Sequence, residues 1–279
     1  MLKSATAGEA YMKPISKTAF YCCGVRMQDA ASDNPVCGDV YAKDFMNEDG
    51  LRVFEDFKDE ANPNASNVAR ARIIDDFLRG ELLANPDLTI VLIGAGFDSR
   101  AFRLKGGAWL EFDEPQIIDY KNERLPAAGC PNELRRIPID FSTESLEEKL
   151  SPFSNRRSVV FVVEGVFAYL DESEIMQMTQ TLRRLFPRHK LIGDLTSKDF
   201  IEKYRGAVHD KITSMGAEFK FAADQPEKIF LENGYHLAEK ISIIERAIDY
   251  GSIKMPKILL KTMFRTLAEG YAIYVFGTH

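Results

Sequence analysis

A short apolar segment that runs into two glycines constrains the fold of this chain more than any other feature. The segment covers residues 88–96, LTIVLIGAG, in which leucine and β-branched residues lead to Gly94 and Gly96. Such a run is typical of a buried parallel strand that enters a tight turn. Open α/β sheets bind ligands in the crevice outside the carboxyl ends of these strands. The segment therefore predicts a parallel sheet with a candidate ligand site at the glycine turn.

Strand-like and helical segments alternate along the rest of the chain. The other expected strands cover residues 108–113, 133–140, 158–165, 190–196, 240–248 and 271–277. The expected helices cover residues 67–83, 114–125, 145–150 and 172–185. This alternation predicts a doubly wound α/β fold, with a mostly parallel seven-stranded sheet and helices on both faces.

Two regions are expected to flank this sheet within one domain over residues 1–279. The first sixty residues carry turn signals such as SDNP and NEDG and read as irregular up to the helix at 67–83. We expect residues 1–80 to form an N-terminal helical cap. Residues 199–235 turn mostly helical, and we expect them to form a helical lid insertion over an acceptor pocket.

Composition excludes several classes of function. The chain has 36 basic and 42 acidic residues, a net charge of -6, which disfavours nucleic acid as a partner. No apolar run approaches the roughly 20 residues that cross a membrane, and the first residues lack the apolar core of a signal peptide. We therefore expect a cytoplasmic protein with a small-molecule substrate. Four cysteines, including the adjacent Cys22 and Cys23, show no metal-binding or disulfide spacing, so we expect reduced thiols and no metal site.

The glycine turn favours an adenosine ligand without phosphates over a dinucleotide. A GxGxxG fingerprint would need a third glycine or an alanine where this chain has Ser99. No lysine followed by serine or threonine stands at the distance that a P-loop requires. A plain turn from strand to helix is the alternative interpretation of the two glycines.

Acidic residues follow the strand-like segments. Asp113 lies 113 − 94 = 19 residues after Gly94, where a carboxylate would accept hydrogen bonds from ribose hydroxyls. Glu111 shares its face of the strand and competes for this role, but Asp113 is nearer the strand's end. Asp140 and Glu164 also end apolar strands, where a carboxylate is costly without a partner or ligand. Asp140 could instead cap the following helix, a role for which Ser142 competes.

Three motifs carry a family resemblance. The segments VLIGAGFDSRAFRL, LEFDEPQIIDYKNERL and VVEGVFAYLDESEI resemble the leucine carboxyl methyltransferase family, which includes bacterial polyketide-type O-methyltransferases, over about residues 16–197. The resemblance implies a class I methyltransferase with S-adenosyl-L-methionine as its cofactor.

The resemblance also implies a role for each motif residue. Gly94 and Gly96 would adjoin the methionine part of the cofactor, Asp113 would hold the ribose, and Glu164 would face the amino group. The other residues that the resemblance assigns to the cofactor site are Lys17 and Arg70 for the carboxylate, Asp140 and Phe141 beside the adenine, and Ala95, Asp98 and Tyr169 within the motifs. Arg72 competes with Arg70, and Lys17 could instead be a solvated surface residue.

The sequence departs from the family at Ser142. The phosphatase-directed branch has an arginine there, which can grip a substrate's terminal carboxylate. We therefore expect an O-methyltransferase that acts on a small-molecule hydroxyl or carboxylate, with a preference for a phenol or enol. The alternatives are a carboxyl methyltransferase of a protein C-terminus and a catalytically silent cofactor-binding protein.

Some residues of the expected lid could serve the acceptor. His209 could act as a general base or lie on the surface of an amphipathic helix. Phe219, Phe221 and Phe230 could line an apolar cavity or form the core of the lid.

Overall fold

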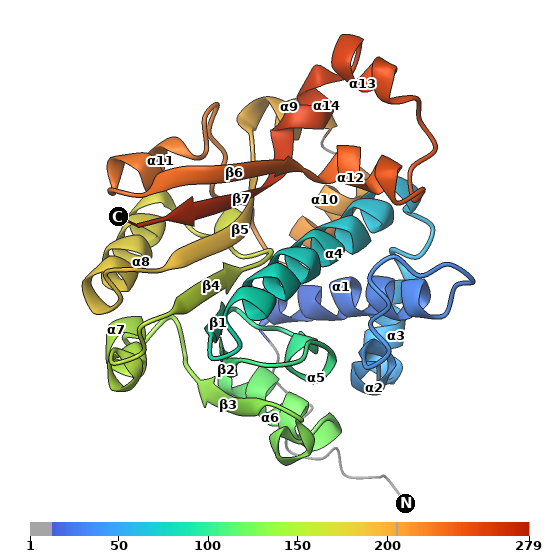
Figure 1. Ribbon diagram of the computed structural model, residues 1–279. Helices are drawn as coiled ribbons and strands as arrows, with labels where there is room; N and C mark the ends of the chain where they lie inside the picture. Colours follow the sequence, from blue (N-terminus) through green and yellow to red (C-terminus); the bar gives the residue numbers. More distant parts are fainter. Residues whose placement is uncertain (1–12, 205, 279) are drawn as a thin grey trace, which may run out of the picture.

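A seven-stranded sheet forms the centre of the protein in a computed structural model that describes residues 13–204 and 206–278 (Figure 1). The strands are β1 (Thr89–Ile93), β2 (Ala108–Asp113), β3 (Glu133–Pro138), β4 (Val159–Val163), β5 (Lys190–Thr196), β6 (His236–Ser242) and β7 (Tyr271–Gly277). They lie in the order β3-β2-β1-β4-β5-β7-β6. The first five strands pair in parallel, and β7 pairs antiparallel with both β5 and β6. The predicted doubly wound, mostly parallel sheet is confirmed.

The strand order places a switch point at the centre of the sheet. The chain moves outward from β1 to β2 and β3, and then returns to β4 on the other side of β1. Parallel pairing sets Ile93 of β1 beside Phe112 of β2. It likewise sets Val163 of β4 beside Gly193 of β5, so the carboxyl ends of these strands lie along one edge of the sheet. Open α/β sheets bind ligands at such an edge.

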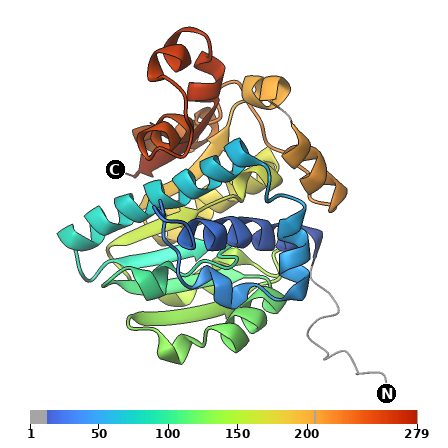
Figure 2. The same ribbon diagram turned by 90° about the vertical axis from the view of Figure 1, so that its right-hand side faces the viewer.

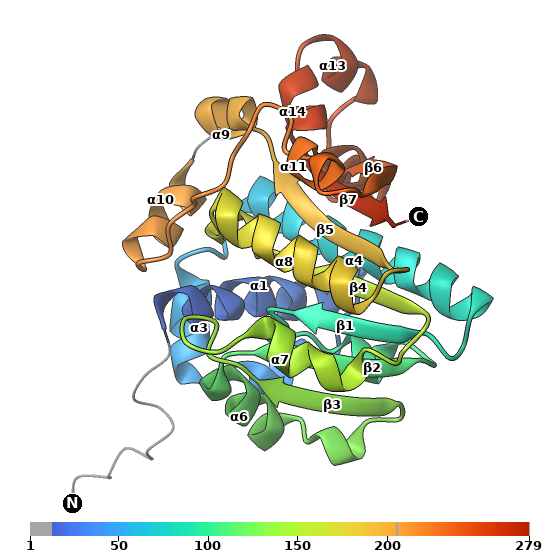
Figure 3. The ribbon, with the colours of Figure 1, turned by 90° about the vertical axis from the view of Figure 1, so that its left-hand side faces the viewer.

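Helices cover both faces of the sheet (Figure 3). Those before β1 are α1 (Pro14–Ala30), α2 (Ala42–Phe45), α3 (Glu48–Glu55) and α4 (Ala61–Ala84). Those between β1 and β5 are α5 (Arg100–Arg103), α6 (Pro115–Arg124), α7 (Leu146–Leu150) and α8 (Glu172–Leu185). Those after β5 are α9 (Lys198–Tyr204), α10 (Ala207–Ser214), α11 (Lys228–Glu232), α12 (Ile243–Asp249), α13 (Lys257–Thr262) and α14 (Arg265–Gly270).

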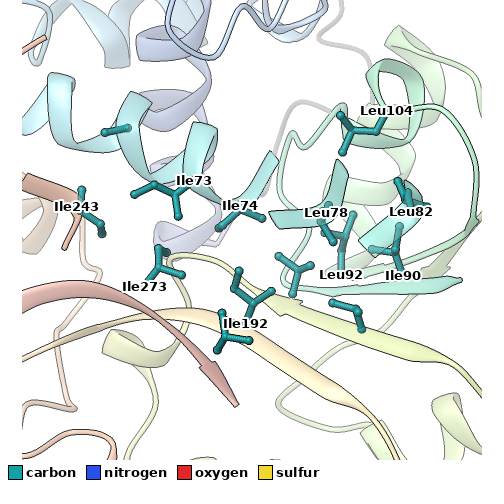
Figure 4. Close-up of a cluster of buried hydrophobic side chains, with 14 of the residues drawn as sticks. Ile73, Ile74, Leu78, Leu82, Ile90, Leu92, Leu104, Ile192, Ile243 and Ile273 are labelled. Carbon is teal, nitrogen blue, oxygen red and sulfur yellow. The ribbon is translucent and has the colours of Figure 1, made fainter. Parts of the chain in front are cut away.

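The core lies between α4 and the sheet. Figure 4 shows Ile74 and Leu78 of α4 beside Ile90, Leu92 and Ile192 of the strands. Alternate strand residues such as Val91 and Phe161 point to the opposite face, where α7, α8 and α11 pack. A sheet that is covered on both faces explains why its strands read as continuous apolar runs.

The N-terminal region differs from the irregular structure that we expected for the first sixty residues. Residues 14–30 form the long helix α1, which lies beside α4 (Figure 2). The SDNP signal does mark a turn, but the NEDG signal marks the start of a helix. The side chain of Asn47 caps α3 by accepting a hydrogen bond from Gly50 N at 2.8 Å. Residues 1–12, on which the prediction about a signal peptide rests, lie outside the described part of the chain.

Two element boundaries also differ from the prediction. The segment 240–248 is not one strand, because Ser242 ends β6 and caps α12 by accepting a hydrogen bond from Glu245 N at 3.2 Å. Helix α4 begins at Ala61 rather than at residue 67. By contrast, α8 covers the predicted residues 172–185, with a capping box formed by Asp171 and Glu174. No helix in the described ranges combines the length and apolar character of a membrane span.

Candidate functional site

The glycine turn after β1 has a backbone that only glycine adopts easily. Gly94 and Gly96 have φ angles of +71° and +47°. A Cβ atom at Gly94 would lie 2.5 Å from Cγ2 of Val166, so this position has no room for a side chain. The amides of Gly94 and Ala95 donate to the carbonyl of Phe112 at 2.9 and 3.1 Å, which fixes the turn beside the end of β2.

Asp113 ends β2 directly beside this turn. Its carboxylate accepts hydrogen bonds from Gly96 N at 2.6 Å and from Glu114 N at 2.7 Å. Burial raises the pKa of Asp113 to about 6, although the two amides partly oppose the shift. A buried carboxylate in this position is an acceptor that a ligand's hydroxyl groups can reach.

Glu111, the competing carboxylate, has a structural role. It is fully buried and pairs with Lys121 Nζ at 2.7 Å and Arg136 Nε at 2.9 Å. These partners neutralise it within the layer between the sheet and α6. Asp113 therefore remains the ribose candidate.

Glu164 and Arg70 meet at the end of β4. The Nε atom of Arg70 donates to Glu164 Oε1 at 2.9 Å, and Nη1 of Arg100 donates to Glu164 Oε2 at 2.7 Å. Burial raises the pKa of Glu164, but Arg100 and Arg70 outweigh it and lower the value to about 2. Arg72, the competitor of Arg70, points away and forms an ion pair with Asp76 at 2.8 Å.

Two residues that the sequence prediction missed complete this cluster. Asp194 of β5 accepts hydrogen bonds from Gly165 N at 2.6 Å and from Arg70 Nη1 at 3.2 Å. The hydroxyl of Tyr271 accepts from Arg70 Nη1 at 2.9 Å and donates to Asp194 at 3.2 Å. Asp194 lies inside β5, with Leu195 and Thr196 after it, so it lacks the strand-end position by which the sequence pointed to Glu164. Tyr271 begins the antiparallel strand β7, so only the topology brings it to this edge.

The motif residues after the glycine turn stabilise the turn itself. Asp98 accepts a hydrogen bond from Arg100 N at 2.6 Å. The hydroxyl of Ser99 donates to the buried Asp39, which also pairs with Arg26 Nε at 2.9 Å. Arg26 in turn donates to the carbonyl of Phe97 at 2.8 Å. Helix α1 is thereby attached to the loop that it covers.

One cavity of about 1090 Å³ joins these groups. It extends from the glycine turn along α4 and under the helices that follow β5. The expected site residues that line it are Arg70, Gly94, Ala95, Gly96, Asp98, Asp113, Phe141, Glu164 and Tyr169.

Lys17 and Asp140 do not line this cavity, contrary to our expectation. Lys17 is exposed on α1, whereas Ser16 and Thr18 face the cavity, because successive side chains on a helix point about 100° apart. Asp140 pairs with Lys13 Nζ at 2.8 Å and accepts a hydrogen bond from Ser142 N at 3.0 Å. The Lys13 hydrogen bond lowers the pKa of Asp140 below its usual range. Neither Asp140 nor Ser142 caps α7, because Ser145 does so.

Aromatic side chains form the part of the cavity beyond Glu164. Tyr169 packs against Phe219 with ring centroids 5.1 Å apart, and His209 stacks on Phe219 at 4.3 Å. All three residues line the cavity. Phe221 and Phe230 do not, because they belong to the core beneath α8 and α11. The segment from α12 to α14, outside the expected lid, also contributes lining residues such as Met255, Phe264 and Leu267.

A family model described as "Leucine carboxyl methyltransferase" matches residues 19–183 of the chain. The chain belongs to the leucine carboxyl methyltransferase family. The match includes the glycine turn and the ends of β2 and β4, which border the cavity.

Individual relatives are similar to the chain at modest identity. An S-adenosyl-L-methionine-dependent methyltransferase, dpfgK, from Gibberella zeae is 25% identical over 80% of this chain and 80% of its own length. A putative S-adenosyl-L-methionine-dependent methyltransferase from Mycolicibacterium paratuberculosis is 31% identical over 59% of this chain and 60% of its own length. The tetracenomycin polyketide synthesis O-methyltransferase TcmP from Streptomyces glaucescens is 26% identical over 64% of this chain and 65% of its own length. The chain thus matches less than two thirds of the length of the last two relatives.

Solved structures agree on the fold. A DUF574 family protein from Streptomyces avermitilis has a TM-score of 0.54 at 11% identity, and the match covers 92% of this chain and 97% of that one.

Proposed function

We propose that this protein is an O-methyltransferase that transfers a methyl group from S-adenosyl-L-methionine to a hydroxyl group of a small, largely apolar molecule. S-adenosyl-L-methionine is the cofactor named for the relatives, and methyl transfer is the reaction of the family. The observation that carries the proposal is one continuous cavity, which joins the glycine turn and Asp113 to the aromatic lining at Tyr169 and Phe219.

The described residues fit this cofactor chemically. Buried Asp113 is an acceptor for two ribose hydroxyls, and Glu164 is an ionised acceptor for the cofactor's ammonium group. Arg70 supplies a cation for its carboxylate. Phe141, which is 41% exposed and lines the cavity, offers a face to the adenine. In this assignment Gly94 and Gly96 leave the backbone close to the methionine part.

The charge of the cavity favours a cationic cofactor. Among the described lining residues the acidic ones are Glu60, Asp98, Asp113, Glu114, Glu144, Glu147, Glu164, Glu174 and Asp194. The basic ones are Arg26, Arg70 and Lys220. Cations behind the lining pair with most of these acids, for example Lys211 with Glu60, Lys13 with Glu114 and Arg100 with Asp98, and reduce the negative charge that a ligand meets. The remaining negative charge attracts a sulfonium and gives modest support to a hydroxyl acceptor over a carboxylate acceptor.

Positioning and desolvation account for much of the catalysis in this proposal. The bound cofactor supplies an electrophilic methyl group, and the acceptor oxygen must lie in line with it at about 3 Å. The protein's part is to hold the acceptor and to exclude water. We propose that residues 1–80 act as a cap and residues 199–235 as a lid for this purpose, and that α12 to α14 extend the lid.

The acceptor that best fits the far end of the cavity is a phenol or an enol. The stacked rings of Phe219 and His209 can pack against a planar apolar molecule. Ser142 lines the cavity at the position where the phosphatase-directed branch of the family has an arginine. A serine cannot form the ion pair by which that arginine would bind a terminal carboxylate. His209 lies on the lining, where it could take the proton of the hydroxyl group.

Calorimetry and an acceptor screen test the proposal. Binding of S-adenosylhomocysteine is expected, followed by product formation with phenols and enols. Tight cofactor binding without turnover on any phenol, enol or carboxylate would instead indicate a catalytically silent cofactor-binding protein. Turnover restricted to peptides with a free C-terminal carboxylate would refute the hydroxyl acceptor.

A further inference from the structure

A buried side-chain oxygen of Asn67 has no hydrogen-bond partner among the described residues. Asn67 is only 6% exposed, and it lines the cavity from α4. Its Nδ2 atom donates to the thiol sulfur of Cys22 at 3.1 Å. Its Oδ1 atom is buried without a partner among the residues that the structure describes. A buried acceptor left unpaired is costly, so it needs an explanation.

A neighbouring asparagine on the same helix shows that the fold can supply hydrogen-bond partners for both ends of a buried side-chain amide. Asn64 is also buried, and its Oδ1 accepts a hydrogen bond from the Tyr21 hydroxyl at 3.0 Å. Its Nδ2 donates to the carbonyl of Phe57 at 2.8 Å. The unpaired oxygen of Asn67 is therefore specific to the side chain that faces the cavity.

Asn67 lies beside Arg70 on the wall of the cavity. It precedes Arg70 by three residues, so both side chains share one face of α4. Nη2 of Arg70 approaches the same Cys22 sulfur at 3.7 Å. Ser66, about one turn before Arg70, and Pro63, about one turn before Asn67, continue the cavity wall toward the start of α4. The unpaired amide oxygen therefore lies on the cavity wall next to Arg70.

A second unpaired group lies in the aromatic part of the cavity. The hydroxyl of Tyr204 is buried without a partner among the described residues, and Tyr204 lines the cavity. Its ring packs against Phe200 at 5.3 Å, and Phe200 packs against Tyr271 at 5.9 Å. An otherwise apolar region thus presents isolated polar atoms to its ligand, which is the usual way for a pocket to fix orientation.

We propose that Asn67 determines acceptor specificity by accepting a hydrogen bond from the hydroxyl group that is methylated. This inference rests on the proposed function and narrows its substrate class. An amide oxygen can pair only with a donor, which a phenol or enol supplies and an ionised carboxylate lacks. The hydrogen bond holds the neutral hydroxyl in the bound complex, so Asn67 is a positioning residue that also selects against carboxylates. During transfer the O–CH3 bond forms as the S–CH3 bond breaks, and the sulfur leaves as the neutral thioether of S-adenosylhomocysteine. The hydroxyl's proton, which an amide oxygen cannot keep, passes to His209 or to solvent.

The test compares ligands that differ in this donor. Calorimetry is performed on protein saturated with S-adenosylhomocysteine, using 1-naphthol, 1-methoxynaphthalene and 1-naphthoate as probes. We expect the native protein to bind 1-naphthol about tenfold or more tighter than the ether, which has no proton to donate. The near-isosteric Asn67→Leu should reduce this preference to about twofold or less. Its affinity for S-adenosylhomocysteine should change by less than about twofold.

Two further variants separate hydrogen bonding from general damage. Arg72→Ala changes the outer face of α4, where Arg72 pairs with Asp76 at 2.8 Å outside the cavity, so the preference for 1-naphthol should persist. Asn67→Asp keeps an acceptor oxygen, and it should retain 1-naphthol and weaken 1-naphthoate further. This variant also provides the test if Asn67→Leu does not fold.

Each contrary result has a distinct meaning. An unchanged preference in Asn67→Leu overturns the proposal, as does native protein that fails to bind 1-naphthol. Equal weakening of S-adenosylhomocysteine would show that Asn67 serves the cofactor's ammonium group. Loss of 1-naphthoate in Asn67→Leu would show that the amide donates to a carboxylate. Native protein that does not bind S-adenosylhomocysteine would refute the proposed function itself.

Discussion

Replacing Asp113 with alanine tests the assignment of the cofactor's ribose. The carboxylate is buried and already accepts hydrogen bonds from Gly96 N and Glu114 N, so it is held in place before any ligand binds. Loss of a charged hydrogen-bond partner costs about 1–3 kcal/mol. This corresponds to a Kd for S-adenosylhomocysteine that is roughly five to 150 times higher. Isothermal titration calorimetry measures the change directly.

The pKa of Asp113 gives the same assignment a pH dependence. Because burial raises this pKa to about 6, much of the free protein carries a protonated Asp113 below that pH. Ribose hydroxyls donate to the ionised form, so binding lowers the pKa and the affinity falls as pH falls through about 6. Between pH 7.5 and 5 the Kd should rise about tenfold. Glu164, whose pKa is about 2, stays ionised and adds no slope in this range.

A ligand without ribose hydroxyl groups completes a thermodynamic cycle, in which both the protein and the ligand are changed. An analogue of S-adenosylhomocysteine that lacks both hydroxyls should bind the native protein weakly, and Asp113→Ala should weaken it little further. The pH dependence should also disappear in the variant. Equal loss of affinity for both ligands, or a slope that survives in Asp113→Ala, would refute the ribose assignment.

Three other substitutions test the rest of the site. Gly96→Val should abolish S-adenosylhomocysteine binding, because a β-branched residue is strained at φ +47°. Circular dichroism checks that the variant is folded, and normal affinity in a folded variant would refute the role of Gly96. Arg70→Ala should weaken the binding of S-adenosylmethionine more than that of decarboxylated S-adenosylmethionine. Arg72→Ala, on the outer face of α4, should change the binding of neither. Equal losses of affinity in Arg70→Ala would show that Arg70 does not bind the cofactor's carboxylate. With a phenol substrate, kcat/KM should rise with pH and level off where His209 loses its proton, and His209→Ala should restore a steeper rise at a lower rate. A flat profile with a carboxylate substrate, unchanged in His209→Ala, would contradict the hydroxyl acceptor.

The parts of the fold that could be predicted from sequence carry local signals. The apolar run and the glycines after it predict the strand at 89–93, and the capping box predicts α8. Helix α1 lacks such a signal because it lies between two clusters of buried residues. Tyr21 and Val25 pack in one cluster, whereas Phe20 and Cys23 pack in the other. A helix buried on two sides shows no single apolar stripe, and that stripe is what sequence patterns detect.

The sequence predicted a candidate site residue where that residue lies at the end of its own strand. Asp113 and Glu164 line the cavity for this reason. Lys17 could not be placed, because its direction depends on the rotational phase of a helix that the sequence did not reveal. Tyr271 meets Arg70 across 201 residues, through the antiparallel return of the last strand. No local pattern encodes that contact.

The preference for a hydroxyl acceptor now rests on two properties that arise only from the folded chain. The acidic side chains that line the cavity come from elements far apart in sequence, such as Glu60 before α4 and Asp194 in β5. The unpaired oxygen of Asn67 depends on how α4 faces α1. The first property acts through long-range charge and weakens with salt, whereas the second acts through one hydrogen bond and does not. Discrimination between 1-naphthol and 1-naphthoate should therefore fall in part at high salt, and the part that remains should disappear in Asn67→Leu.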